Sequence, residues 1–459
     1  MNPDRLVTET RPIGKTSAIG WLGIGDAERR CHDVTITSAP GAVRTARTER
    51  TRAAIVAAAH DAFVTRGYRA TSLRDVAAAA GISHPGLLRH FATKDEVLAA
   101  VVDLFERDNE LELLERMAAE DPGTLAYSDV ARRNETVPGY LALFAALTGE
   151  ASTPRHPAHQ IMRDRYARLR DQSTDVIDEA IAQDTVAADR DPAGEAVRVA
   201  AAWDGLQLLA QYLPDRVDIV GALETHEASL ALPVGWRDPD EPAPTDTPAP
   251  VPSMPSFMPA DTQSPLGYRV GRERRGLILD GATALFAEEG YGDTSLRDIA
   301  ERVGVSKSTL LHYYGSKEEL LSAVLSHRDR LIESRDSYTP ADRAADELRA
   351  LSRGATENAA KAPGLIEVYA VLSCEAVPAD HPAHAYFEER FRGVVDHFAA
   401  LFRTAQDDGD LPAHRDPESE AVWLTALWDG LQYQWLYDRD AVDVAAHLAA
   451  HLDDVLPRT

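Results

Sequence analysis

The sequence predicts an all-α protein made of two similar units in one chain. Three observations carry this prediction. A set of motifs occurs twice in the same order, apolar residues recur at helical spacing in both copies, and a proline-rich segment lies between them. No convincing run of alternating β-branched residues interrupts the helical pattern. We therefore expect two helical units joined by a linker.

Three short motifs carry the repeat. Thr71-Ser-Leu-Arg-Asp75 recurs at 294–298, His156-Pro-Ala-His159 at 381–384, and Trp203-Asp-Gly-Leu-Gln207 at 428–432. The offset is 223 residues for the first pair and 225 for the other two, so the copies are collinear apart from a two-residue insertion. Chance does not explain three collinear matches, and the chain is a tandem duplication.

The start of each copy has the pattern of a helix-turn-helix. In the first, an apolar stripe from Ile55 to Phe63 stops at Gly67, Thr71 is a predicted cap for a short second helix, and Ser83 caps the third. The second copy repeats this pattern from Ile278, with Thr294 and Ser306 as the caps. A short capped helix that follows a glycine turn and carries polar residues on one side is typical of DNA-reading units.

The order of residues over about fifty positions is more specific. Both copies read Gly-Tyr-x-x-Thr-Ser-Leu-Arg-Asp, then Gly-Ile/Val-Ser, and then Leu-Leu-x-x-Phe/Tyr-x-Thr/Ser-Lys-Asp/Glu-Glu. This order resembles the N-terminal DNA-binding domain of the TetR/AcrR family. The resemblance implies a transcriptional regulator, normally a repressor, in which each unit has a three-helix helix-turn-helix domain followed by a helical ligand-binding and dimerisation domain. It also implies double-stranded operator DNA and a small-molecule effector as partners, and no cofactor.

The resemblance assigns DNA contacts by position. Residues at the start of each third helix should face base edges, Lys94 and Lys317 should bind phosphate, and arginines ahead of the first helix should form an arm. Leu88 and Leu311 stand where the family often has tyrosine, so no hydroxyl contact is assigned there. The candidate DNA-binding residues are Arg44, Arg47, Thr71, His84, Pro85, Gly86, Arg89, His90 and Lys94 in the first unit, and Arg272, Arg274, Thr294, Lys307, Ser308, Thr309, His312, Tyr313 and Lys317 in the second.

The C-terminal part of each unit resembles the helical domains of the same family less specifically. The family's last two helices form a four-helix bundle with those of a partner, and its middle helices enclose a ligand cavity. Here the last helices are predicted at 193–213 and 217–231, and again at 418–436 and 441–456. The aromatic residues that could line a cavity are Tyr140, Phe144, Tyr166, Trp203, Tyr369, Tyr386, Trp423 and Trp428.

These features divide the chain into segments. The ten prolines at 233–265 favour extended polyproline II, which would restrict the arrangement of the two units very little. We expect a disordered N-terminal extension at 1–43, helix-turn-helix domains at 44–98 and 268–321, ligand-binding and dimerisation domains at 99–232 and 322–459, and a linker at 233–267.

Composition limits the other classes. The net charge of −26 argues against a nucleic-acid partner, but residues 43–98 carry nine Lys or Arg against five Asp or Glu. No apolar stretch approaches the roughly 18 residues of a membrane span. Cys31 and Cys374 are the only cysteines, so neither a disulfide framework nor a cysteine metal site can form, and we expect a cytoplasmic protein.

The sequence gives little evidence of metal binding or catalysis. His156 with His159, and His381 with His384, have the i, i+3 spacing of metal ligands, but no third ligand stands at fixed spacing and a proline-led helix start explains the pattern more simply. Neither a catalytic triad nor a phosphate loop is present, so we expect no enzyme and no metal.

Three assemblies remain open. The two units can pair within the chain as a pseudo-dimer on an imperfect palindrome, because His84-Pro-Gly86 and Lys307-Ser-Thr309 offer different donors. Units can also pair between chains, giving a homodimer with four DNA-binding heads. In a third interpretation the chain is a small-molecule-binding module in which one DNA-binding half, with second-copy residues 269–321 near −1 in net charge, has decayed.

Overall fold

The computed structural model describes residues 40–68, 71–104, 124–137, 139–154, 156–254, 269–333, 341–361 and 363–458. These residues form helices and loops with no strand among them, which confirms the all-α prediction. None of the described helices is long and apolar enough to cross a membrane. The chain divides into two compact units, one ending at Arg50 and one spanning Thr51–Thr459. All contacts described below lie within the second unit.

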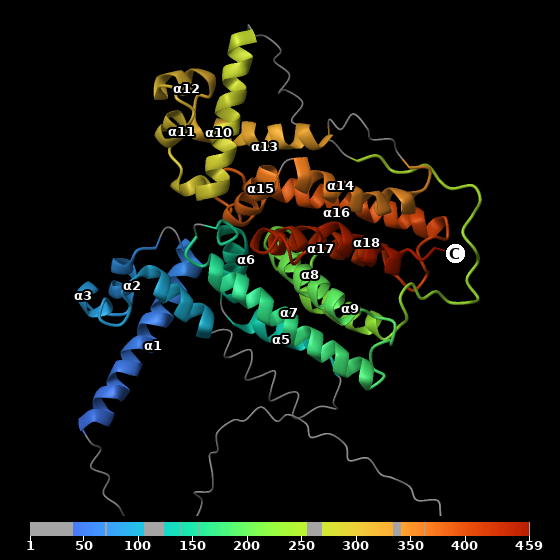
Figure 1. Ribbon diagram of the computed structural model, residues 1–459, viewed down its shortest axis with the longest axis horizontal. Helices are drawn as coiled ribbons and strands as arrows, with labels where there is room; N and C mark the ends of the chain where they lie inside the picture. Colours follow the sequence, from blue (N-terminus) through green and yellow to red (C-terminus); the bar gives the residue numbers. More distant parts are fainter. Residues whose placement is uncertain are drawn as a thin grey trace, which may run out of the picture. The chain divides into compact units, whose positions relative to one another are not determined.

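The first helix-turn-helix consists of α1 (Pro40–Arg66), α2 (Leu73–Ala79) and α3 (His84–Leu87), followed by helical residues 94–104 (Figure 1). The helix α1 begins inside the segment predicted to be disordered, and residues 1–39 lie outside the described part. Gly67 follows α1 with a φ of 81°, a left-handed conformation that glycine adopts without steric cost.

The second helix-turn-helix repeats this arrangement. It consists of α10 (Arg269–Asp293), α11 (Leu296–Arg302), α12 (Lys307–Tyr313) and α13 (Lys317–Glu333). Gly290, the counterpart of Gly67, has a φ of 77° and bends α10 near its end. The same turn chemistry therefore shapes both copies.

The caps of the second helices differ from the prediction by one residue. Ser72 caps α2 and forms a capping box with Asp75, and Ser295 with Asp298 does the same for α11. Thr71 and Thr294 are buried instead. The predicted caps Ser83 and Ser306 are confirmed, since their side chains accept hydrogen bonds from the backbone amides of Gly86 and Thr309.

The remaining helices of each copy follow in matching order. Those of the first copy are α5 (Tyr127–Thr136), α6 (Tyr140–Glu150), α7 (His159–Ala182), α8 (Pro192–Tyr212) and α9 (Ile219–Leu230). Those of the second are α14 (Ala344–Lys361), α15 (Pro363–Glu375), α16 (His384–Asp407), α17 (Pro417–Tyr437) and α18 (Val444–Val455). The four predicted C-terminal helices are thus found within a few residues of their expected ends.

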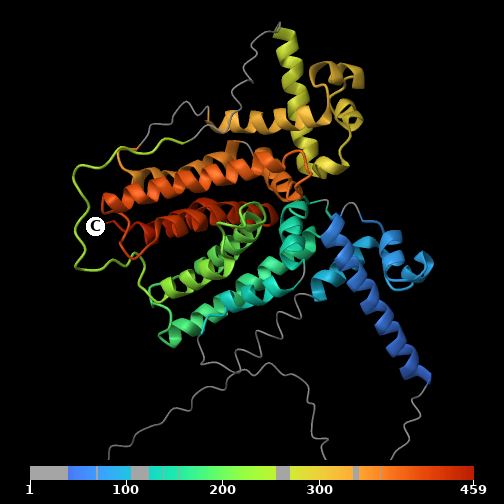
Figure 2. The same cartoon turned by 180° about the vertical axis from the view of Figure 1, so that it is seen from behind.

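The two copies meet along α8 and α17, which lie side by side (Figures 1 and 2). A Cβ atom on Gly205 of α8 would overlap the carbonyl oxygen of Ala426 on α17. At the equivalent positions 225 residues on and back, a Cβ on Gly430 would overlap the carbonyl of Ala201. Glycine at both points lets the helix backbones touch, and the reciprocal contacts are those of an approximate twofold axis.

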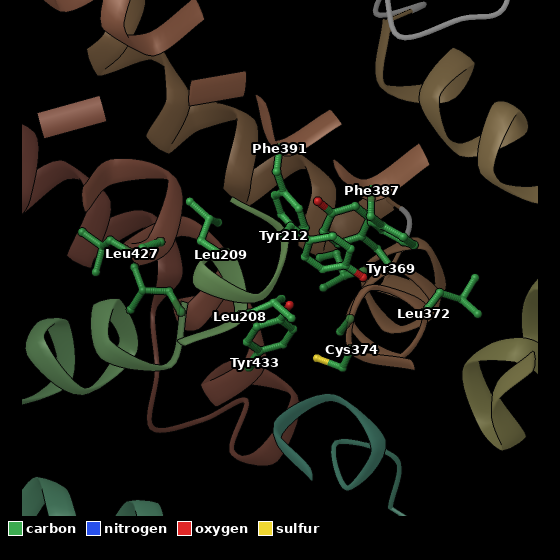
Figure 3. Close-up of a cluster of buried hydrophobic side chains, with 14 of the residues drawn as sticks. Leu208, Leu209, Tyr212, Tyr369, Leu372, Cys374, Phe387, Phe391, Leu427 and Tyr433 are labelled. Atoms are coloured by element: carbon green, nitrogen blue, oxygen red, sulfur yellow. The ribbon is translucent and has the colours of Figure 1, made fainter. Parts of the chain in front are cut away.

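A second pair of reciprocal contacts surrounds the same axis. Tyr212 at the end of α8 donates a hydrogen bond to the carbonyl of Ser373, at 2.6 Å, and its counterpart Tyr437 donates to the carbonyl of Thr148, at 2.8 Å. Figure 3 shows Tyr212 within the buried aromatic cluster of the second copy, where its ring lies 5.1 Å from that of Phe391. Each copy thus inserts a tyrosine into the core of the other.

Helices α6 and α15 also pack against each other near this axis. Gly149 on α6 faces Cys374 on α15, which is the equivalent residue of the other copy. A Cβ on Gly149 would overlap the Cys374 side chain. One small and one larger residue therefore share a space on the axis.

The linker is not the loose tether that its composition predicts. Residues 233–254 are described, and they run along the second copy with specific hydrogen bonds. The Thr245 amide donates to the carbonyl of Asp408, at 2.8 Å, and the Ala249 amide donates to its carboxylate, at 2.9 Å. Arg343 donates to the Thr245 carbonyl at 2.8 Å. This half of the linker is held in place; residues 255–268 lie outside the described part.

Candidate nucleic-acid interface and effector site

The third helix of the second copy, α12, presents polar side chains on one face. Lys307, Ser308 and His312 are exposed, and Thr309 and Tyr313 are half-buried. Leu310 on the opposite side is fully buried and fixes the helix to the body of the unit. The exposed face thus offers an ammonium, hydroxyls and an imidazole, which are groups that bind base edges and phosphates.

The third helix of the first copy, α3, is shorter and differs in chemistry. Pro85 and Arg89 are exposed, and His84, Gly86 and His90 are half-buried. Pro85 lies in the first turn, where its missing amide donor costs little. The two candidate reading surfaces are therefore built alike but carry different donors.

One arginine contacts the end of each third helix. The guanidinium of Arg52 lies 4.1 Å from the ring centroid of Phe91 and donates to the carbonyl of His90, at 3.2 Å. Arg275 makes the same contacts with Tyr314, at 5.6 Å, and with the Tyr313 carbonyl, at 3.4 Å. Both arginines are exposed, and these contacts hold their side chains against the end of the third helix.

The other arginines of the predicted arm belong to regular helix. Arg44 and Arg47 lie in α1, and Arg272 and Arg274 in α10, so the predicted arm ahead of the first helix is wrong as a description of the backbone. Arg47 and Arg274 are exposed. The side chains of Arg44 and Arg272 lie outside the described part.

The lysine that opens each fourth helix stacks on a tyrosine. The Lys94 ammonium lies 4.1 Å from the ring centroid of Tyr68, and the Lys317 ammonium lies 4.1 Å from that of Tyr291. Partial burial lowers the pKa of Lys317, against the opposing charges of Glu375 and Glu318. Neither tyrosine is among the predicted contact residues, although the Gly-Tyr step in both copies was the available signal.

Thr71 and Thr294 do not reach the surface. Each is 1% exposed, and its hydroxyl donates to the carbonyl of the glycine that ends the first helix: Gly67 at 2.9 Å and Gly290 at 2.7 Å. A hydroxyl proton committed to a buried carbonyl does not contact phosphate. This corrects their assignment as side-chain phosphate contacts.

Three of the four predicted ligand-lining aromatics of the first copy lie near one another, and one of them contacts a half-buried carboxylate, Asp204. Tyr140, Phe144 and Tyr166 are buried, and Trp203 is half-buried. The Tyr166 hydroxyl donates to Asp204 at 2.8 Å. Burial raises the pKa of Asp204 to about 6, although Arg165 opposes the shift.

The second copy has a more highly charged cluster at the same place. Asp329 accepts hydrogen bonds from Tyr386, at 2.7 Å, and from Arg390, at 2.9 Å, while Arg328 lies 3.9 Å from the ring centroid of Tyr369. Burial raises the pKa of Asp429, the counterpart of Asp204, to about 7 against the attraction of Arg328 and Arg390.

The last two predicted aromatics are not part of this cluster in the contacts described. Trp423 stacks on His226 of the first copy with ring centroids 4.4 Å apart, and Trp428 is half-buried. The eight aromatics therefore do not line a single cavity. The sequence alone does not tell which side chains of α17 face the interior of their own copy and which face the other copy.

The paired histidines take part in backbone hydrogen bonds. His156 Nδ1 accepts from the Ala158 amide, at 3.2 Å, and His159 Nδ1 lies 2.9 Å from the Ala151 carbonyl. His381 and His384 repeat both contacts with Ala383 and Ala376. These bonds close the turn that leads into α7 and α16.

Comparison with known proteins bears on these elements. The family described as "Bacterial regulatory proteins, tetR family" matches residues 55–101 and again 278–324, which are the two helix-turn-helix segments. The chain belongs to the TetR family. The "BetI-type transcriptional repressor, C-terminal" family matches residues 367–457 of the second copy. This chain is therefore a DNA-binding TetR-family transcriptional regulator with a tandem duplication, and not an enzyme.

Individual TetR-family proteins match one copy at a time. The chain is 28% identical over 197 residues to the HTH-type transcriptional regulator TtgR of Pseudomonas putida, covering 40% of this chain and 89% of that protein. It is 27% identical over 198 residues to the HTH-type transcriptional repressor KstR of Mycolicibacterium smegmatis, covering 41% and 89%. A transcriptional regulator from Saccharomonospora viridis, solved in complex with choline, is 25% identical with a TM-score of 0.36, covering 41% of this chain and all of that one.

Proposed function

We propose that this TetR-family regulator works as a pseudo-dimer formed within one chain, and that it is a repressor released from DNA by a small molecule. The observation that carries the proposal is the reciprocal contact of Gly205 with Ala426 and of Gly430 with Ala201. Equivalent residues that exchange partners are the mark of a twofold dimer interface. In this chain both sides of such an interface are present.

In this proposal, residues 44–98 and 268–321 are the DNA-binding domains, and 99–232 and 322–459 bind ligand and hold the halves together. A helix-turn-helix dimer places its two recognition helices in successive major grooves, about 34–36 Å apart. Because α3 starts with His84 and Pro85 while α12 starts with Lys307 and Ser308, the two half-sites should differ. We infer an imperfect palindrome as the operator, read in the cytoplasm.

The buried polar clusters support a ligand-responsive body. In the first copy, Arg165 of α7 and Asp204 of α8 are shielded from water between these helices. In the second copy, Arg390 of α16 and Asp429 of α17 are shielded in the same way. Buried charge is costly unless it is paired, so such clusters are poised to reorganise around a polar ligand. A ligand that moves α8 against α17 would alter the separation of the reading heads and shift the population away from the DNA-bound state.

A homodimer with four heads is the first alternative. It would require a second bundle surface, yet the glycine faces of α8 and α17 are already covered by each other. Light scattering on the purified protein decides between the two. We expect a particle of the 50.0 kDa chain mass that binds DNA, whereas a particle of twice that mass would overturn the pseudo-dimer.

A decayed DNA-binding half is the second alternative. It is opposed by the exposed Lys307, Ser308 and His312 of α12 and by the intact capping of α11 and α12. DNA selected from a random pool by the full chain provides the test. Two unequal half-sites whose order reverses when the two recognition helices are exchanged support the proposal; a strict palindrome that is unaffected by the exchange contradicts it.

A further inference from the structure

A cavity of about 680 Å³ lies where the first turns of α8 and α17 meet α9 and α18. Residues from equivalent positions in the two copies line it in pairs, such as Glu195 with Glu420 and His226 with His451. The cavity therefore lies on the approximate twofold axis and takes its walls from both copies. Val234, at the start of the linker, adds a wall that has no counterpart.

Ion pairs occupy the basic groups of this lining. Arg190 lies 3.3 Å from Glu195 and 3.0 Å from Asp454, the second contact joining the two copies. Arg415 also pairs with Asp454, at 3.1 Å, and with Glu420, at 2.8 Å. The remaining lining arginines are paired as well, Arg198 with Glu195 at 2.9 Å and Arg216 with Asp396 at 2.6 Å and with Glu418 at 3.4 Å. Each lining guanidinium therefore has at least one carboxylate partner, although the Nε atom of Arg415 has no hydrogen-bond partner in the described part of the chain.

Carboxylates remain in excess after this pairing. The lining contains eight Asp or Glu side chains against four Arg, and Asp189 and Asp453 are exposed at its edge. Asp189 accepts the backbone amide of Val234, at 3.1 Å, and Asp453 has only a loose pair with Arg458, at 3.7 Å. The electrostatic potential of the cavity is therefore negative and favours a cation.

Two histidines add ring nitrogens without partners among the described residues. His226 and His451 both line the cavity, and in the described part of the chain the Nε2 atom of each is buried without a hydrogen-bond partner. His451 is 7% exposed. Burial lowers the pKa of His226 to about 4 and that of His451 to about 3, so both rings are neutral near pH 7. A neutral imidazole accepts a hydrogen bond at its unprotonated nitrogen, and leaving that nitrogen buried and unpartnered is costly.

We propose that this cavity binds an organic polyamine and that the bound cation bridges the two copies. Its ammonium groups would donate hydrogen bonds to the carboxylates of both copies and to the two histidines. Its methylene chain would lie along the apolar part of the lining, which includes Val234, Val422 and Trp423. Trp423 stands where the first copy has Arg198, so an aromatic surface replaces a cation on one side of the axis.

The site is distinct from the buried clusters within each helical domain. A ligand on the axis contacts α8, α9, α17 and α18 together. Its affinity therefore depends on how the two copies are arranged and not on the interior of one copy. Its effect on DNA affinity rests on the proposed function, but its binding does not. An experiment can therefore contradict the binding site without contradicting the proposed function, and the reverse.

Calorimetric titration of the full chain with spermidine, without DNA, tests the site. We expect one spermidine per chain, because the axis is shared. The double variant Asp189→Asn with Asp453→Asn should weaken binding by about tenfold or more, since it removes two charges and keeps the amide-accepting oxygens. Asp178→Asn with Asp407→Asn is the matched control, because both residues are exposed on α7 and α16 away from the cavity, and it should leave the affinity unchanged.

A second variant tests the aromatic wall. Trp423→Leu should weaken spermidine binding but leave the dependence of the spermidine affinity on sodium chloride concentration unchanged. Absence of binding heat at millimolar spermidine, two sites per chain, or equal affinities in the test and control double variants would overturn the proposal. Magnesium binding with the same sensitivity to the variants would also overturn it, because the apolar wall would then contribute nothing. A loss of DNA binding in the double variant without spermidine bears on the proposed function alone.

Discussion

Tyr166 donates a hydrogen bond to Asp204 in the first copy, at 2.8 Å. The equivalent of Tyr166 in the second copy is Phe391, which has no hydroxyl to offer Asp429. Burial raises the pKa of both carboxyl groups, to about 7 for Asp429 and to about 6 for Asp204. The hydrogen bond from Tyr166 lowers the pKa of Asp204 against burial, and Phe391 cannot supply the equivalent bond to Asp429.

The replacement of Asp429 by Asn should stabilise the protein more at pH 8 than at pH 5. The folded-state pKa of Asp429 lies above its ordinary value of 3.8, so the folded state holds its proton more tightly and loses stability as pH rises from about 4 to about 7. Asn carries no such cost, so its stabilising effect should be larger at pH 8 than at pH 5 by about 3 kcal/mol. Urea unfolding at both pH values measures it, and an equal effect at both would contradict the prediction.

Phe391→Tyr is the complementary change. A hydroxyl placed as in Tyr166 would donate to Asp429 and lower its pKa, since a hydrogen bond to the charged form stabilises it. The pH range of the stability loss should then move down toward that of Asp204. Carboxyl titration by NMR of the variant checks this, and an unchanged titration would mean that the ring lies too far from Asp429.

Gly205→Val should destabilise the folded chain by about 3 kcal/mol or more, because its side chain would occupy the space of the Ala426 carbonyl. Gly276→Ala is a matched control in the helix α10, where an added Cβ meets nothing within 4 Å. The control should stabilise by about 0.5–1 kcal/mol. Chemical denaturation of both variants provides the measurement, and similar effects in the two would argue against close helix contact.

Lys94→Ala and Lys317→Ala should each lower the salt dependence of DNA binding by about one unit of slope, because we propose that each ammonium binds one phosphate. Arg392→Ala, on the exposed face of α16, is the control for lost charge alone. Fluorescence anisotropy over a range of salt, with DNA selected by the full chain, measures the slope. A change for Lys94 but not for Lys317 would support decay of the second DNA-binding half.

Arg343→Ala should increase the rate of proteolytic cleavage within 237–249 by roughly tenfold, since it removes a bond to the linker carbonyl of Thr245 and an ion pair with Asp410. Arg353→Ala, an exposed change on α14, is the control. Limited proteolysis with mass spectrometry locates the cut. Equal rates in both variants would mean that Arg343 does not hold the linker.

Local sequence signals predicted the helix-turn-helix units and the ends of α8 and α17, because caps, glycine turns and helical periodicity act over a few residues. These signals predicted the wrong capping residue where two adjacent residues both carry a hydroxyl. Thr71 and Ser72 both carry a hydroxyl, and only the tertiary fold buries the first and leaves the second free to cap α2.

Long-range partners explain the other differences. The composition of the linker predicts extension, but nothing in it reveals that Asp408 accepts hydrogen bonds from the backbone amides of Thr245 and Ala249. In the same way Arg52 reads as part of a basic run, and its contact with Phe91 joins residues far apart in sequence. Trp423 is predicted to line a cavity of its own copy, but it stacks on His226 of the other copy and lines the cavity that the two copies share.

The contact between Gly149 and Cys374 has a consequence for how such a chain evolves. In a dimer of identical subunits the residue on the axis meets itself, so two glycines would leave a gap and two cysteines would collide. Only the mixed pair fits. Separate genes for the two copies would have to be expressed in equal amounts and find each other among unsuitable self-pairs, whereas fusion fixes their ratio at one to one. Each copy can then drift away from self-recognition without losing its partner.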